Sequence, residues 1–158
     1  RWNSGCYLLR GELVSIKVKR IRVNKVNRLP RGTVEAGFPQ GTDSFVLEKA
    51  IWNEFGTPNA KRPIPARPFM RMAVTTDSAQ TRLKKTMARE AKKALANGTT
   101  DDVVMQRIGV FVEGLIKDSI TNLRSPPNAE WTIEKKGSDN PLIDTGNMKQ
   151  SVTSKVTE

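Results

Sequence analysis

Few residues in this sequence are suited to covalent or acid–base chemistry. The chain has 158 residues, no histidine and a single cysteine, Cys6. The lack of histidine excludes Ser–His and Cys–His catalysis, histidine general bases and nearly all zinc or iron sites. A lone thiol forms no internal disulfide and reacts only beside an activating base, so Cys6 is interpreted as a small apolar residue. We therefore expect no metal and no cofactor.

The acidic residues offer two candidate sites, and each has a simpler explanation. Asp144, Thr145 and Gly146 match the tripeptide of aspartic proteases, in which two aspartates share a proton. Too little chain follows Gly146 for the β-structure that such a domain needs, so Asp144 is interpreted as a helix cap. Asp101 and Asp102 are interpreted as first-turn acids, which the helix dipole favours, and not as metal ligands. The sequence thus predicts a protein that is not an enzyme.

The basic residues form two blocks. The net charge is +11. Residues 1–31 hold nine basic residues and one acid, residues 61–93 hold ten and two, and residues 32–60 hold one and four. Such blocks are suited to a polyanion, to acidic surface on another copy of the chain, or to solvent alone. The residues assigned to a polyanion-binding or subunit-contact face are Lys17, Lys19, Arg20, Arg22, Arg82, Lys85, Arg89, Lys92 and Lys93.

Alternating apolar residues predict strands near both ends of the chain. Residues 14–18 alternate with period two, and the register then slips, which either a bulge near residues 19–20 or a second strand after a bend would explain. Residues 33–38 predict a second strand, and residues 151–158 can form a third.

Helical periodicity predicts the rest of the structure. Residues 44–54 follow Thr42 and Asp43, either of which can cap a helix. The clearest helix covers residues 77–96, with its apolar and basic residues on opposite arcs, and residues 101–122 form a second long helix. Shorter helices are expected over residues 128–136, with Trp131 directed inward, and over residues 145–151, capped by Asp144.

These elements predict an α+β fold, in which a small, mostly antiparallel sheet packs against two long antiparallel helices. Residues 1–31 are assigned to an extended basic N-terminal arm or strand, and residues 32–158 to a single domain. No segment approaches the ~18 apolar residues of a membrane span, so no membrane partner is expected. Glycines 109 and 114 in the last long helix are interpreted as points of close helix packing, within or between subunits.

A proline-rich loop precedes the first long helix. Pro65 and Pro68 fix the backbone within residues 64–70, so the segment loses little entropy when it docks. The loop presents Arg67 and an apolar pair at fixed orientations. We therefore interpret it as an anchor at an interface.

Two motifs give the sequence a family resemblance. Residues 52–57 (Trp-Asn-Glu-Phe-Gly-Thr) are followed by residues 64–71 (Ile-Pro-Ala-Arg-Pro-Phe-Met-Arg). Further matches follow in order at residues 108–109, 116–120, 126–129, 132–133, 136–138 and 141–146. Over residues 33–156 the chain resembles the neck or tail-completion proteins of long-tailed phages and prophages, and is similar to the minor tail protein Z group. That family usually opens with a helical segment, whereas residues 1–31 here are basic and strand-like.

The resemblance implies a structural virion protein. It would form a homo-oligomeric ring of six or twelve copies at the head-proximal end of the tail, in a neck, tail-completion or tail-terminator role that joins head to tail. Its partners would be other neck, tail-tube and head-completion proteins, in the host cytoplasm during assembly and then in the virion. The interface candidates are Trp52, Glu54, Phe55, Ile64, Pro65, Arg67, Pro68, Phe69, Arg71, Asp144 and Thr145. The alternative is a basic DNA-binding protein that contacts the viral genome or its end.

Overall fold

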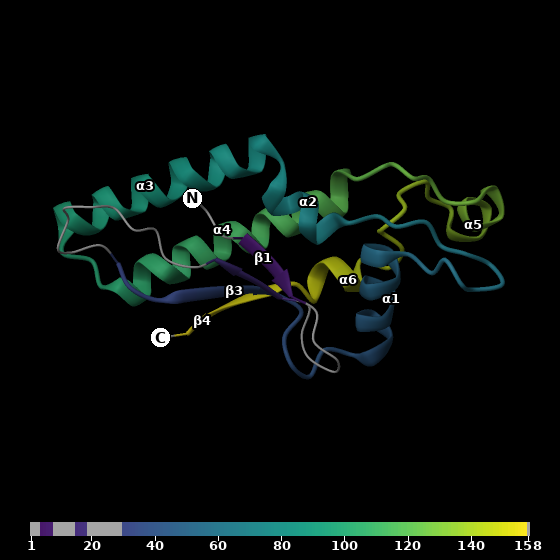
Figure 1. Cartoon of the computed structure of the whole chain (residues 1–158), viewed down its shortest axis with the longest axis horizontal. Helices are drawn as coiled ribbons and strands as arrows, with labels where there is room; N and C mark the ends of the chain where they lie inside the picture. The colour runs from purple at the N-terminus through teal and green to yellow at the C-terminus, as the bar shows by residue number, and fades with distance from the viewer. Residues whose placement is uncertain (1–3, 8–14, 19–29, 158) are drawn as a thin grey trace.

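A single antiparallel sheet forms one layer of the molecule (Figure 1). The structure is a computed structural model that describes residues 4–7, 15–18 and 30–157. The strands lie in the order β1-β2-β3-β4, and every pairing is antiparallel. They are β1 (Ser4–Tyr7), β2 (Ser15–Val18), β3 (Thr33–Gly37) and β4 (Thr153–Thr157). The described parts of the basic N-terminal segment are therefore strands of the same sheet as β3.

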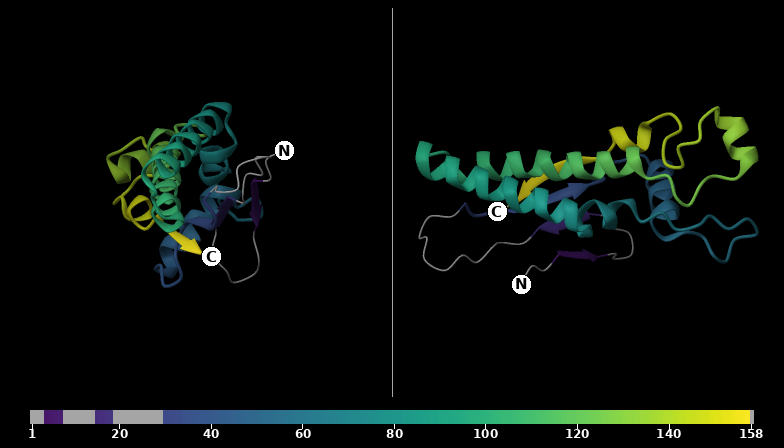
Figure 2. Two further views of the ribbon diagram at one scale, coloured as in Figure 1. Left: turned by 90° about the vertical axis from the view of Figure 1, so that its left-hand side faces the viewer. Right: turned by 90° about the horizontal axis from the view of Figure 1, so that it is seen from above.

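Helices form the second layer and extend beyond the sheet at one end (Figures 1 and 2). They are α1 (Ser44–Phe55), α2 (Phe69–Thr75), α3 (Asp77–Asn97), α4 (Asp101–Asn122), α5 (Glu130–Lys136) and α6 (Asn147–Gln150). The two longest, α3 and α4, run along the length of the molecule, and α4 lies next to β3 and β4. The mixed α+β class predicted from the sequence is confirmed.

Helix α4 lies against the inner face of the sheet. Val34 pairs with Val156, and Ala36 pairs with Ser154, so these four positions share one face. Gly109 of α4 lies directly above them. A Cβ atom at Gly109 would come within 3.0 Å of the Ser154 Oγ, which shows how closely the helix approaches the strands.

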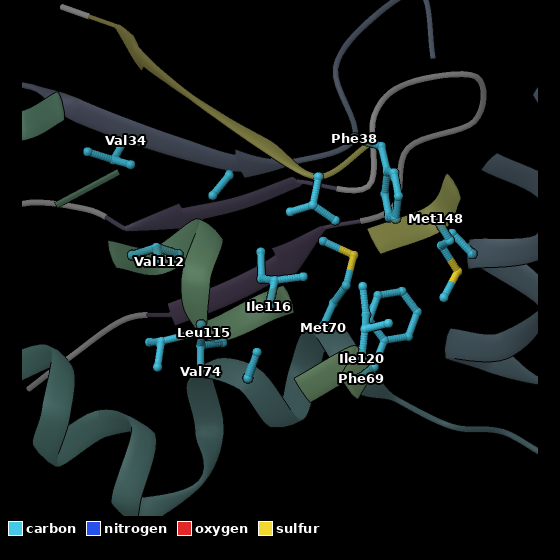
Figure 3. Packing of buried hydrophobic residues seen from close by; sticks show 14 of the residues in the cluster. Val34, Phe38, Phe69, Met70, Val74, Val112, Leu115, Ile116, Ile120 and Met148 are labelled. Carbon is cyan, nitrogen blue, oxygen red and sulfur yellow. The ribbon is translucent and has the colours of Figure 1, made fainter. Parts of the chain in front are cut away.

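The hydrophobic core lies between α4, the sheet and α2 (Figure 3). Phe38 and Phe69 are fully buried, and their rings meet edge to face with centroids 6.5 Å apart. Met70, Ile116 and Ile120 are also inaccessible to solvent. Because α4 contributes a continuous apolar face to this core, it organises the whole domain.

The structure confirms some of the local predictions and contradicts others. Residues 69–75, partly assigned to the extended loop, form α2, whose start is stabilised by a distant side chain described below. Asp43, one of the two predicted caps of α1, accepts hydrogen bonds from the amides of Phe45 and Val46. Asp144 is not a cap, because α6 begins at Asn147 after Gly146 and has no side-chain cap. The bulge at residues 19–20, or the second strand after a bend, lies outside the described residues.

Candidate docking groove

A groove of about 1190 Å³ lies at the end of the molecule where the helices extend beyond the sheet. Its walls come from α1, from the proline-rich loop and from the segment between α4 and α6. Six of the predicted interface residues line it, namely Trp52, Ile64, Pro65, Arg67, Asp144 and Thr145. The fold thus brings both motifs, within residues 52–71, next to the further matching segments of residues 126–146, although about 60 residues separate Arg67 from Pro126 and Pro127.

Arg67 joins the proline-rich loop to residues 126–128 and to α1. Its Nε donates to the Pro126 carbonyl at 2.7 Å, and its Nη2 donates to the Pro127 carbonyl at 2.8 Å and to Asn128 Oδ1 at 3.2 Å. Its Nη1 donates to Asn53 Oδ1 at 3.1 Å. Only 4% of the residue is exposed. The acceptors found for it among residues 30–157 are all neutral, and burial lowers the pKa of its guanidinium.

Glu54 performs a similar task at the start of α2. Pro68 occupies the N-cap position and has no side chain that can accept a hydrogen bond. The buried Glu54 carboxylate, from the last turn of α1, accepts from the amide of Met70 at 2.9 Å and from that of Arg71 at 3.2 Å. Burial raises the pKa of Glu54 above its ordinary value, although these two amides and the Arg71 charge lower it.

The proline-rich loop is closed at its base. The Thr57 amide donates to the Ile64 carbonyl at 2.9 Å, and the Ile64 amide donates to Thr57 Oγ1 at 2.8 Å. Gly56 has φ +74°, and a Cβ there would lie 2.8 Å from the Ile64 oxygen. A glycine is therefore required where the chain leaves α1.

Asn140 organises the opposite wall. Its Nδ2 donates to the Thr121 carbonyl at 3.0 Å, and its Oδ1 accepts from the amides of Leu142 and Ile143. Its own carbonyl accepts from Lys136 Nζ at 2.9 Å. Asn140 could not be identified from the sequence, because an asparagine after Gly-Ser-Asp is typical of an ordinary turn.

The accessible surface of the groove is aromatic and cationic. Trp52 and Trp131 are 38% and 57% exposed. The Arg62 guanidinium lies 6.0 Å from the Trp131 ring centroid. Lys136 also lines the groove; burial lowers its pKa, while the nearby Asp144 charge raises it. The prediction that Trp131 points inward is wrong, because α5 has no buried residue.

The structure corrects part of the predicted interface. Glu54, Arg67 and Phe69 are at most 4% exposed, and their contacts are with this chain, so they shape the groove without presenting a surface to a partner. The Arg67 and Glu54 side chains are hydrogen-bonded within the chain, and Phe69 packs in the hydrophobic core. Phe55 and Arg71 are exposed but lie outside the groove lining, and Pro68 is half-buried.

The predicted basic face is present on α3. The side chains of Arg82, Lys85, Arg89, Lys92 and Lys93 are all exposed. Lys17 lies in β2, whose side chains are not described, and Lys19, Arg20 and Arg22 lie outside the described residues.

Comparisons with protein-family models, with curated proteins and with solved structures found no match to this chain. Among the residues that the structure describes, no three His, Cys, Asp or Glu side chains lie close enough to hold a metal ion. The described helices include none with the length and hydropathy of a membrane span.

Proposed function

We propose that the protein is a non-enzymatic structural subunit of a tailed-phage virion. Copies assemble into a ring at the head-proximal end of the tail and take part in joining head to tail. The proposal rests on the resemblance of residues 52–71 and 126–146 to neck and tail-completion proteins. The ring has six copies if it follows the symmetry of a tail, and twelve if it belongs to a connector.

The observation that carries the proposal is the convergence of residues 52–71 and residues 126–146 on one groove. Arg67 and Glu54 are buried for internal hydrogen bonds, and their effect is to hold an open surface in a fixed shape. Preorganised surfaces with exposed tryptophan are typical of protein interfaces, because a rigid aromatic side chain loses little entropy on binding. The groove therefore suits a permanent assembly contact better than a catalytic step.

Asn128 adds a specific polar feature to the groove. Among the buried side-chain nitrogen and oxygen atoms of the described residues, its Nδ2 is the one for which no hydrogen-bond partner is found. A buried donor without a partner costs free energy, typically about 1–3 kcal/mol.

The long helices suit the same role. Helices α3 and α4, of 21 and 22 residues, give the subunit a stiff, elongated body. The groove lies at one end of that body (Figure 1). A subunit with a rigid axis and a docking site at one end can join neighbouring rings of a neck without changing its own fold.

Complementation of a phage that lacks the gene tests the proposal. Trp52→Ala, in the groove, is expected to abolish the joining of heads and tails while the purified protein stays folded. Leu95→Ala, at an exposed apolar position outside the groove, is the matched control and should support normal virion yield. Light scattering on the wild-type chain, alone and mixed with head and tail proteins, provides the second measurement. A strictly monomeric chain in every mixture would overturn the proposal.

The exposed basic face of α3 supports DNA binding as a second candidate function. Six lysine and arginine residues lie on this helix, against two acids. Duplex binding should then weaken steeply with salt, because phosphate contacts release counterions. The double substitution Lys85→Glu with Lys92→Glu should reduce affinity, and the same loss with Leu95→Ala would indicate general damage instead. Binding without salt dependence would eliminate this candidate.

A further inference from the structure

The docking groove is lined by more cations than acids. Its charged lining residues are four cations and two acids, namely Lys49, Arg62, Arg67, Lys136, Asp43 and Asp144. The ion pairs found between described residues involve none of these four cations. Within the part of the chain that the structure describes, the groove therefore holds positive charge that no close carboxylate neutralises.

The two acids of the groove do not balance this charge. Asp43 is already engaged, because its carboxylate accepts hydrogen bonds from the amides of Phe45 and Val46 at the start of α1. Asp144 is exposed and caps no helix. One carboxylate is thus left to face all the cations of the lining.

Three of the cations lie near one another. Burial is the main cause of the lowered pKa of Lys136, and the charges of Arg67 and Lys49 lower that pKa further. The nearby charge of Asp144 acts in the opposite direction. The Lys136 ammonium donates to the Asn140 carbonyl and has two further N–H donors. A ligand that carries negative charge would relieve the repulsion between these groups.

Exposed aromatic rings lie beside the cations. Phe45, Trp52 and Trp131 all line the groove, and all three are exposed. The Lys49 Nζ lies 4.1 Å from the centroid of the Phe45 ring, and the Arg62 guanidinium lies over Trp131. The volume of about 1190 Å³ exceeds the roughly 300–1,000 Å³ that is typical of small-molecule pockets. The groove therefore suits several residues of a polypeptide, with apolar and acidic side chains close together.

We propose that the groove binds an acidic segment of a partner protein. Carboxylates of that segment pair with Lys49, Arg62 and Lys136. Its apolar side chains pack on Trp52 and Trp131. Charge complementarity selects this chemistry, and another copy of this chain is a poor occupant because its net charge is +11. The inference rests on the proposed structural role and specifies the chemistry of the neighbour that docks at this site.

A nucleic-acid strand fits the same lining less well. Aromatic side chains beside cations also suit single-stranded nucleic acid. Of the four cations, however, only Arg62 is exposed, and the others are half-buried or buried. The exposed carboxylates of Asp43 and Asp144 would repel a continuous row of phosphates. A protein segment can place neutral side chains at those positions.

Fluorescence anisotropy with labelled peptides tests the proposed chemistry. The probe is a short peptide rich in glutamate and leucine, and its control has glutamine at every glutamate position. The wild-type chain should bind the acidic peptide about tenfold more tightly than the control, as expected for the gain of two or more partly exposed ion pairs. Equal affinities for the two peptides, or no binding of the acidic one, would overturn the inference.

Substitutions show whether the groove is the site. Lys49→Gln combined with Arg62→Gln should weaken binding of the acidic peptide about tenfold and leave circular dichroism unchanged. Asp144→Asn should strengthen binding, because it removes the competing carboxylate. The matched control combines Lys85→Gln with Lys92→Gln on α3, which changes the net charge equally outside the groove. An equal loss of affinity in that control would mean that total charge binds the peptide, and the inference would fail.

Two further measurements separate this inference from its alternatives. Oligothymidylate that binds more tightly than the acidic peptide, and loses affinity in the Lys49 and Arg62 variant, would assign the groove to nucleic acid instead. In the complementation experiment the same variant should lower virion yield. Normal yield from it, together with failure of Trp52→Ala, would overturn the acidic partner and leave the proposed function intact. Normal yield from Trp52→Ala as well would contradict the proposed function itself.

Discussion

The two ends of this molecule are held together by different means. Along α3 and α4, apolar side chains face the sheet and charged side chains lie outside, where their ion pairs are exposed, as in Arg82 with Asp118. At the groove end, the chain consists largely of loops and short helices. There, the buried side chains of Glu54, Arg67 and Asn140 bond to backbone groups that regular structure would otherwise satisfy.

The difference shows what a loop-rich docking site requires. Backbone amides and carbonyls must be paired wherever they are buried, and a helix or sheet does this by itself. Loops rely on side chains, and a guanidinium with five donors or a carboxylate with several acceptor sites can satisfy many groups at once. The free energy of the groove end is therefore concentrated in a few polar residues, whereas that of the helix pair is spread over many apolar ones.

The largest expected effect tests whether a few polar residues stabilise the groove end. Arg67→Met should lower the free energy of unfolding by about 3 kcal/mol, because it leaves buried carbonyl and amide acceptors without donors. Urea denaturation monitored by tryptophan fluorescence measures it. Arg62→Met, in the same loop but exposed, is the matched control and should change stability by less than about 0.5 kcal/mol. Equal effects of the two substitutions would contradict the comparison.

The second prediction concerns the helix pair. Gly109→Ala should destabilise the protein by about 2 kcal/mol, because the added methyl group would overpack the contact with Ser154 and Val34. Alanine is the better helix former, so a helix in isolation would be stabilised. Thermal unfolding distinguishes the two results. A rise in the melting temperature would show that α4 lies less closely on the sheet.

The third prediction returns to the groove end and concerns pH. Because burial raises the pKa of Glu54 from an ordinary value near 4.5, the folded chain binds the Glu54 proton more tightly than the unfolded chain. This contribution to stability is full below the ordinary pKa and is lost as pH rises through the raised one. The stability of the wild type relative to Glu54→Gln should therefore increase as pH falls from 7 toward 5.

Urea denaturation of both proteins at each pH measures that difference, and the other acids cancel because both chains contain them. A difference that instead grows with rising pH would mean that the amides of Met70 and Arg71 outweigh burial. The pKa of Glu54 would then lie below its ordinary value.

The same contrast explains which features could be predicted from the sequence. The long helices follow from their periodicity, and β3 from its alternation, because each depends on local pattern. Helix α2 was missed because its first turn depends on Glu54, fifteen residues before Phe69. Arg67 was recognised as important, but its burial depends on carbonyls at residues 126–127, and no local pattern encodes that contact. Six of the predicted interface residues thus line the groove, but the buried role of Arg67 could not be predicted from the sequence.

The smallest predicted effect compares the outer face of α4, at Gly114, with the face that packs on the sheet, at Gly109. Gly114→Ala should stabilise the chain by about 0.8 kcal/mol, because alanine is favoured in helices and its Cβ meets no other atom here. The same substitution five residues earlier, at Gly109, should have the opposite sign. Chemical denaturation of the monomer at low concentration separates this effect from assembly. If Gly114→Ala were as destabilising as Gly109→Ala, the outer face of α4 at Gly114 would already be covered within the chain.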